Sequence, residues 1–178
     1  MHITVYLGAN CGTDPHLAQA VRELGAWIGA AGHTLVYGGS KTGLMGLLAQ
    51  SALAQGGSVI GVEPEGAACM KASLEAGHVV SLPTANTIAD GTAVKTPGDK
   101  VFPYIRDHVD QIITIPDTEL VEAFLDVMEK HKMVVENSGL LSVAALRHLS
   151  CQGLNVVCVL SGGNMDVITM ASIVQHGL

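Results

Sequence analysis

Short apolar runs alternate along the chain with longer segments in which apolar residues recur at helical spacing. Several apolar runs end in glycine-rich turns, and a helical segment usually follows. This alternation is typical of repeated strand–helix–strand units. It predicts five strands, at residues 3–7, 34–37, 58–62, 111–115 and 155–160. It predicts helices at about residues 14–31, 44–55, 67–76, 100–109, 116–132 and 138–149, and a last helix after residue 164.

The connections between the strands predict how the sheet is built. Strand–helix–strand crossovers are right-handed and join parallel strands, so all five strands are expected to be parallel. We therefore predict an α/β fold in three layers (α/β/α), with a Rossmann-like, doubly wound sheet of strand order 3-2-1-4-5. Residues 1–178 are expected to form one domain. Residues 77–98 show little periodicity, and loops of that length are usually functional or disordered.

The composition supports a sheet that is buried on both faces. Apolar residues make up 48% of the chain and charged residues 14%. The formal net charge of −7 argues against binding to nucleic acid or to an anionic membrane, because both need a basic surface. No apolar run reaches the roughly 18 residues of a membrane span, and no signal peptide is recognised, so a cytoplasmic protein is expected. The four cysteines have no zinc-ligand spacing.

Glycine turns follow strands one, two and five, and all three are expected at the carboxyl edge of the sheet, where doubly wound folds bind ligands. Free amides at a helix N-terminus attract phosphate, so one interpretation is a small phosphate-bearing ligand. The other is that glycine serves only the backbone angles of a tight turn, and the sequence leaves both open. The candidate residues in these turns are Gly8, Gly38, Gly39, Ser40, Thr42, Gly43, Ser161, Gly162, Gly163 and Asn164.

Residues 1–64 carry a specific pair of motifs. Tyr37-Gly38-Gly39 is followed at close spacing by Gly43-Leu44-Met45-Gly46. With these motifs the segment resembles the start of the LOG-type (cytokinin-activating) phosphoribohydrolases, which split a nucleoside 5′-monophosphate into base and ribose phosphate. The motifs that hold that family's catalytic arginine and glutamate do not occur in this sequence.

The remainder of the chain carries a different set of motifs. Ile60-Gly61-Val62-Glu63-Pro64, Ala89-Asp90-Gly91, Val134-Val135-Glu136 and Ser161-Gly162-Gly163-Asn164 follow one another in that order. Residues 60–178 thereby resemble the C-terminal part of the threonine ammonia-lyases (threonine dehydratases), fold-type II enzymes that deaminate serine or threonine with pyridoxal phosphate (PLP). The resemblance implies that Ser161 bonds the pyridine nitrogen and that the backbone near Asp90 and Gly91 lines the cofactor.

The second resemblance is also incomplete. The family's cofactor-linking lysine and its tetraglycine phosphate loop have no counterpart in this sequence. Lys41 is not expected to replace that lysine, because it lies in a glycine turn that is expected to be exposed to solvent, whereas a reactive lysine is usually buried or beside another cation. No cofactor is therefore expected, with PLP kept as the alternative. Some relatives bind a divalent ion through a residue matching Glu63. Because Cys69 stands where they have an acid, no metal is expected.

The two resemblances together predict a chimera of residues 1–61 and 62–178 in one domain. We expect an engineered scaffold without a complete active site, which binds at most a phosphate-bearing ligand and forms homodimers through exposed apolar surface. One alternative is a PLP-dependent threonine or serine ammonia-lyase, which would release ammonia. The other is a nucleoside 5′-monophosphate phosphoribohydrolase, which would release a free base.

Overall fold

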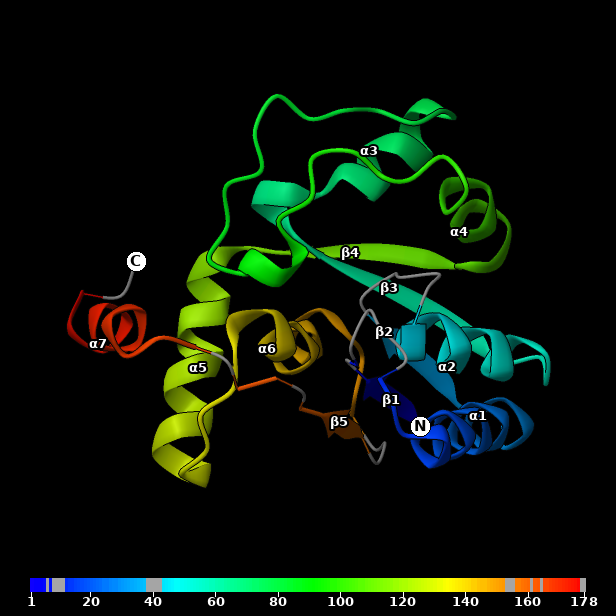
Figure 1. Ribbon diagram of the computed structural model, residues 1–178, viewed down its shortest axis with the longest axis horizontal. Coiled ribbons are helices and arrows are strands. Elements are labelled where there is room, and N and C mark those ends of the chain that lie inside the picture. Colours follow the sequence, from blue (N-terminus) through cyan, green and yellow to red (C-terminus); the bar gives the residue numbers. More distant parts are fainter. Residues whose placement is uncertain are drawn as a thin grey trace.

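In a computed structural model of the chain, five parallel strands form one sheet with helices on both faces (Figure 1). The structure describes residues 1–5, 7, 12–37, 43–152, 156–160, 162–163 and 165–176. The strands are β1 (His2–Val5), β2 (Thr34–Tyr37), β3 (Ser58–Pro64), β4 (Gln111–Ile115) and β5 (Val157–Val159). The α-helices are α1 (Pro15–Ala30), α2 (Gly43–Leu53), α3 (Cys69–Ala76), α4 (Phe102–His108), α5 (Asp117–His131), α6 (Asn137–Ala144) and α7 (Val167–His176).

The ends of α1 show how local residues set these bounds. The Asp14 carboxylate accepts a hydrogen bond of 2.9 Å from the backbone N–H of His16, and Pro15 occupies the first helical position, where its missing N–H costs nothing. Beyond the helix, Gly32 adopts a φ of 65°, a left-handed conformation that glycine enters without steric cost. The sequence pattern predicted both ends of this helix correctly.

The strand order is β4-β3-β2-β1-β5, so the predicted order 3-2-1-4-5 is wrong. β4 pairs with β3, and β5 takes the place beside β1 that was predicted for β4. From β1 to β4, each new strand lies on the same side of the previous one, and right-handed crossovers therefore place the connecting helices α1 to α4 on one face of the sheet. After β4 the chain returns to the opposite edge of the sheet, where β5 lies beside β1, and the connecting helices α5 and α6 cover the other face. The coarser prediction, a parallel α/β/α sheet, is confirmed.

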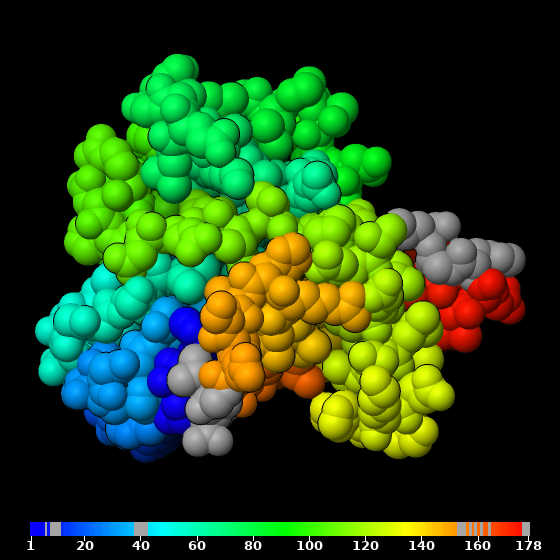
Figure 2. Space-filling model, turned by 180° about the vertical axis from the view of Figure 1, so that it is seen from behind, coloured from blue at the N-terminus to red at the C-terminus, as the bar shows by residue number. Residues whose placement is uncertain are grey.

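Each face of the sheet carries its own apolar core. Leu35 and Tyr37 of β2 pack toward α1 and α2, in a cluster that also includes residues of α3 and α4. Val36, between them, points the other way and packs with α5 and α6. The alternation follows from the two-residue period of a strand, whose successive side chains leave opposite faces. Seen from behind, α6 and the residues after it (orange) lie between the N-terminal elements (blue) and α5 (Figure 2).

Two predicted elements differ in detail from the structure. The helix predicted at 67–76 is a 3₁₀ turn, Glu65–Ala67, followed by α3, and the helix predicted at 138–149 is α6 followed by a 3₁₀ turn, Ala145–His148. Residues 77–98 contain one short 3₁₀ turn, Asp90–Thr92, and backbone hydrogen bonds tie them to the rest of the molecule. Across the described residues, no helix combines the length and the apolar character that a membrane crossing requires.

Candidate functional site

A pocket of about 220 Å³ opens beside the start of α6 and the segment that joins β5 to α7. Three stretches of the chain that lie far apart in sequence contribute to its wall. The lining residues are Thr87, Ile88, Asp90, Glu136, Asn137, Met165, Asp166 and Thr169. The fold thereby brings together two motifs that the sequence marked separately, the Asp90 turn and Glu136.

The stretch before Asp90 is held in place by the starts of two helices. The Asp117 carboxylate, at the start of α5, accepts hydrogen bonds from the Thr87 hydroxyl (2.5 Å) and from the Ile88 backbone N–H (2.9 Å). The Asn137 side-chain amide, at the start of α6, donates to the Ile88 carbonyl (3.0 Å). These bonds position the Asp90 turn against α5 and α6, so its place in the pocket wall depends on both helices.

Glu136 packs directly against the turn that follows β5. Its backbone N–H donates to the Gly162 carbonyl (3.1 Å). Gly162 has a φ of 83°, and a Cβ placed there would lie well under 3.0 Å from the Glu136 carboxylate. Glycine is therefore required at 162 for two reasons, the left-handed backbone and the space that the carboxylate occupies.

Gly91 is a second position where the site needs a residue without a side chain. A Cβ at Gly91 would lie 2.8 Å from the Ser138 hydroxyl oxygen, near the start of α6. Gly91, Glu136 and Gly162, three residues from separate motifs, thus converge around the N-terminal turn of one short helix. Gly163 lies beside the carbonyl of Val134, at ordinary contact distance.

The other sequence candidates are divided between described and undescribed parts of the chain. Gly43 is the first residue of α2 and has a φ of 66°, which suits glycine at a tight entry into a helix. The phosphate role predicted for these turns stays a prediction. Outside the described residues lie Gly8, Gly38, Gly39, Ser40, Thr42, Ser161 and Asn164.

A second cavity, of about 260 Å³, lies on the opposite side of the Asp90–Thr92 turn, between β3, α3 and the segment that leads into α4. Most of its wall is apolar, with Met45, Met70 and Ile112 among the lining side chains. Burial raises the pKa of the Cys69 thiol in its wall to about 11, so this thiol is protonated and unreactive near neutral pH. The motif residues Gly61 to Pro64 and Gly91 line this cavity, but sequence reasoning did not predict a cavity there.

Glu63, the residue considered as a metal ligand, caps a helix. Its carboxylate accepts hydrogen bonds of 2.9 Å from the backbone N–H groups of Met70 and Lys71 in the first turn of α3. Burial raises its pKa, and these two bonds act in the opposite direction. In the described part of the chain, no group of three or more histidine, cysteine or acidic side chains is placed to hold a metal ion.

Sequence reasoning did not identify Asn137 and Asp166 as residues of the first pocket. Asn137 is the first residue of α6, and in the sequence an asparagine at a helix start is explained by helix capping alone. Asp166 does cap α7, because its carboxylate accepts from the Thr169 backbone N–H (2.8 Å) and hydroxyl (2.5 Å). The signal that would have identified them is spatial, since only the fold places both helix starts beside Glu136.

Comparison with known proteins identifies relatives along most of the chain. A family model for "Pyridoxal-phosphate dependent enzyme" matches residues 12–162. L-threonine ammonia-lyase from Geobacter sulfurreducens is 42% identical over 122 residues, which are 67% of this chain and 30% of that protein. L-threo-3-hydroxyaspartate ammonia-lyase from Pseudomonas is 41% identical over 130 residues, 72% of this chain and 41% of that protein. The chain thus spans less than half the length of these two relatives.

A solved structure has the same fold. Threonine deaminase isoform 2 from Solanum lycopersicum, in its processed form, superposes with a TM-score of 0.69 at 27% identity. The superposition covers 97% of this chain and 53% of that chain. The fold described above is therefore shared with about half of a threonine deaminase.

These matches correct two expectations and leave a third without support. The inactive engineered scaffold is contradicted, because the matched family consists of enzymes and the relatives are ammonia-lyases. The expectation of no cofactor is contradicted, because the matched family depends on pyridoxal phosphate. The match also runs through residue 61 without a break, and the comparisons give no support to a phosphoribohydrolase segment or to a fusion.

Proposed function

The chain belongs to the family of pyridoxal-phosphate dependent enzymes, and from this we propose that it forms part of the active site of a lyase that deaminates a 3-hydroxy amino acid such as threonine or serine. The names of its relatives, L-threonine and L-threo-3-hydroxyaspartate ammonia-lyase, share that substrate chemistry. Since the chain spans only part of their length, the activity is proposed from the site that it does contain.

One observation carries the proposal: three separate motifs converge at the start of α6. The Asp90-Gly91 turn, the Glu136 carboxylate and the Gly162-Gly163 turn lie together although they are dozens of residues apart in sequence. Two of the glycines stand where a Cβ would collide with a neighbouring polar group. Glycine turns without side chains, next to polar side chains, leave space for a flat ring and offer it hydrogen-bond partners.

The described residues fit the ring end of pyridoxal phosphate. Bound in such a site, the cofactor supplies an electron sink for cleavage of bonds at the amino-acid α-carbon. Gly162 and Gly163 would leave room beside a ring, and the Glu136 carboxylate beside Gly162 would offer a hydrogen-bond acceptor to a ligand there. Among the described residues that line the pocket, none is a lysine. The glycine turn at 38–43, our candidate for the phosphate end, falls largely outside the described residues.

The protein's own side chains have two tasks in this proposal. Glu136, fixed against Gly162 by packing and by its backbone hydrogen bond, keeps an anionic acceptor in one orientation. Asp117 and Asn137 keep the Asp90 turn closed over the start of α6 through their bonds to Thr87 and Ile88. Such pre-organisation lowers the cost of orienting a ligand when it binds.

The test is reconstitution of the whole chain with pyridoxal phosphate. We expect saturable binding of pyridoxal phosphate, seen as a change in the absorbance of the cofactor, and ammonia release from L-threonine or L-serine. Glu136→Gln should lower ammonia release, whereas Asp126→Asn, on the outer surface of α5, should not. A protein that stays colourless with the cofactor and releases no ammonia from either amino acid contradicts the proposal.

A further inference from the structure

The cavity between β3, α3 and the segment that leads into α4 has the size and the wall of a binding site for an apolar molecule. Its volume of about 260 Å³ exceeds the roughly 150 Å³ of an apolar cavity that admits benzene. Met45, Met70 and Ile112 in its wall come from three separate elements, and Val94 and Val101 come from the segment before α4. Methionine side chains adapt to ligands of different shape. The cavity therefore suits a substituted ring or a branched aliphatic chain.

The polar groups of this wall disfavour an ionised ligand. Among the described residues that line the cavity, none is a lysine, arginine or histidine, so an anion would find no positive partner. Glu63 is the acidic residue of that lining, and its carboxylate already accepts two backbone N–H groups of α3, at 2.9 Å each. The thiol of Cys69 stays protonated at neutral pH, as described above. A neutral, largely apolar molecule fits this wall best.

The cavity and the pocket at the start of α6 share one element, the 3₁₀ turn Asp90–Thr92. Asp90 lines the pocket, whereas Gly91 and Thr92 line the cavity. The backbone N–H and the hydroxyl of Thr92 both donate to the Ala89 carbonyl, at 2.9 Å each, so the turn is held together as one unit. A movement of this turn therefore changes the walls of both spaces at once.

The turn has room to move on one side only. Toward α6 it is in close contact, because even a Cβ on Gly91 would lie 2.8 Å from the Ser138 hydroxyl oxygen. On its other side the turn borders the cavity. A molecule that fills the cavity would therefore keep the turn against α6, with Asp90 in its place in the pocket wall.

We propose that the cavity is a second binding site, which takes a small, neutral, apolar molecule and supports the Asp90–Thr92 turn on the side away from α6. A ligand there raises the affinity of the pocket at the start of α6 for its own ligand, because the pocket wall is already ordered. Linkage requires the reverse effect to be equally large. The second site does not depend on the proposed function, and only the measurement of coupling uses pyridoxal phosphate.

The first experiment measures binding to the whole chain without added cofactor. Fluorobenzene and 4-fluorobenzoate carry the same ring, but only 4-fluorobenzoate is an anion at neutral pH. In titrations followed by ¹⁹F NMR, we expect saturable binding of fluorobenzene, with an affinity about tenfold above that of 4-fluorobenzoate. The methyl signals of Met45 and Met70 should shift as fluorobenzene binds. Equal affinities for the two probes, or no saturable binding of fluorobenzene, would overturn the second site.

A variant that fills the cavity tests where the probe binds. Val101→Phe adds a ring at a residue of the wall and should weaken fluorobenzene binding about tenfold. Val79→Phe is the matched control, because Val79 packs in the same core cluster but is not among the described residues that line the cavity. Unchanged binding in Val101→Phe places the probe elsewhere and removes the proposal. If that variant does not fold, the two probes and the methionine signals of the wild-type chain decide.

The second experiment measures the coupling between the two spaces. Pyridoxal phosphate is titrated by absorbance with and without saturating fluorobenzene, and we expect its affinity to rise about fivefold. Val101→Phe should abolish this effect of fluorobenzene. An unchanged or lowered affinity for the cofactor would overturn the coupling.

The two proposals fail in different ways. If fluorobenzene binds but pyridoxal phosphate does not, the proposed function falls and the second site stands. The coupling is then decided by the backbone amide signals of Asp90 and Glu136, which must shift with fluorobenzene for it to hold. If pyridoxal phosphate binds and ammonia is released, but fluorobenzene shows no saturable binding, the second site falls and the lyase stands.

Discussion

The two faces of the sheet are packed by opposite means. On the first face, α1 meets α2 through glycine: Gly25 and Gly29 have no room for a Cβ, because carbonyl oxygens of α2 lie well under 3.0 Å from where it would stand. On the second face, α5 and α6 meet the sheet through large side chains such as Phe124 and Leu140. The first face is therefore sensitive to added atoms and the second to removed ones.

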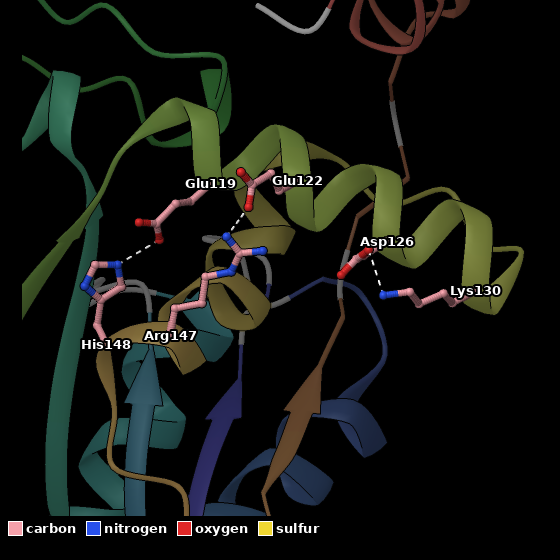
Figure 3. A network of polar contacts seen from close by, with 6 residues as sticks. All are labelled: Glu119, Glu122, Asp126, Lys130, Arg147 and His148. Carbon is pink, nitrogen blue, oxygen red and sulfur yellow. Dashed lines mark hydrogen bonds and ion pairs between the residues drawn. The ribbon is translucent and has the colours of Figure 1, made fainter.

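The faces also differ in what they do with polar groups. Among the described residues, the ion pairs of the first face, Lys71–Glu75 in α3 and Arg106–Asp107 in α4, each lie within one helix. On the second face, α5 also forms ion pairs with the 3₁₀ turn Ala145–His148. Figure 3 shows Glu119 and Glu122 of α5 pointing toward His148 and Arg147, and Asp126 paired with Lys130 along the same helix. The pocket at the start of α6 belongs to this second face. Among the described residues, ion pairs that join separate elements thus occur on the second face only.

The largest effect is expected from removing a large side chain on the second face. Phe124 is 1% exposed, so Phe124→Ala leaves a cavity and should cost about 3 to 5 kcal/mol of unfolding free energy. Urea denaturation followed by circular dichroism measures this. Phe124→Leu, which keeps most of the volume, should cost much less. Equal losses for the two variants would show that this core relaxes around the gap.

Adding one methyl group should be damaging on the first face. Alanine favours helix over glycine by about 1 kcal/mol, so propensity alone predicts that Gly29→Ala stabilises α1. The Ala52 carbonyl stands where the Cβ would go, and we expect a loss of about 2 to 3 kcal/mol instead. Ala20 is exposed on the same helix, so the loss of stability in Ala20→Gly measures the difference in helix propensity between alanine and glycine alone. A stabilising Gly29→Ala would refute close helix contact as the organising feature of this face.

A smaller effect on stability is expected at the site, with a larger one on binding. Gly162→Ala forces a side chain into a left-handed backbone and against the Glu136 carboxylate, at a cost of about 1 to 2 kcal/mol. Displacing that carboxylate should also weaken the binding of pyridoxal phosphate, measured by absorbance titration. The Cβ that Gly163→Ala adds would lie 3.7 Å from the Val134 carbonyl, an ordinary contact, so this variant should leave stability unchanged. Similar losses of stability in both variants would mean that the turn, and not Glu136, is the sensitive feature.

The smallest effect is expected from the surface charges of the second face. A double-mutant cycle with Arg147→Ala and Glu122→Ala should give a coupling below about 1 kcal/mol, because both side chains are largely exposed and water screens their attraction. Thermal unfolding at low and high salt measures it, and added salt should reduce the coupling. A coupling that salt does not change would indicate a structural role beyond charge.

Several features of the fold followed from short stretches of sequence. Asp14 and Pro15 at one end and Gly32 at the other marked α1, and the apolar run at 58–62 marked β3. The position of β4 did not follow, because nothing within residues 111–115 states which strand lies beside them. That choice depends on pairing with β3, where Gln111 lies beside Ile60, a residue about 50 positions earlier. Association of two copies stays a prediction.

The candidate site divides in the same way. Asp90, Gly91 and Gly162 were recognised from motifs, since a turn needs particular residues at adjacent positions. Asn137 was missed because its significance lies in its place in the pocket wall, and that place exists only once the neighbours are known. Within the chain, backbone preferences and hydrophobic periodicity act over a few residues and determined the strands, the helices and their parallel direction. Tertiary packing, which acts between distant segments, alone decided the strand order and gathered three acidic residues and Asn137 around a single pocket.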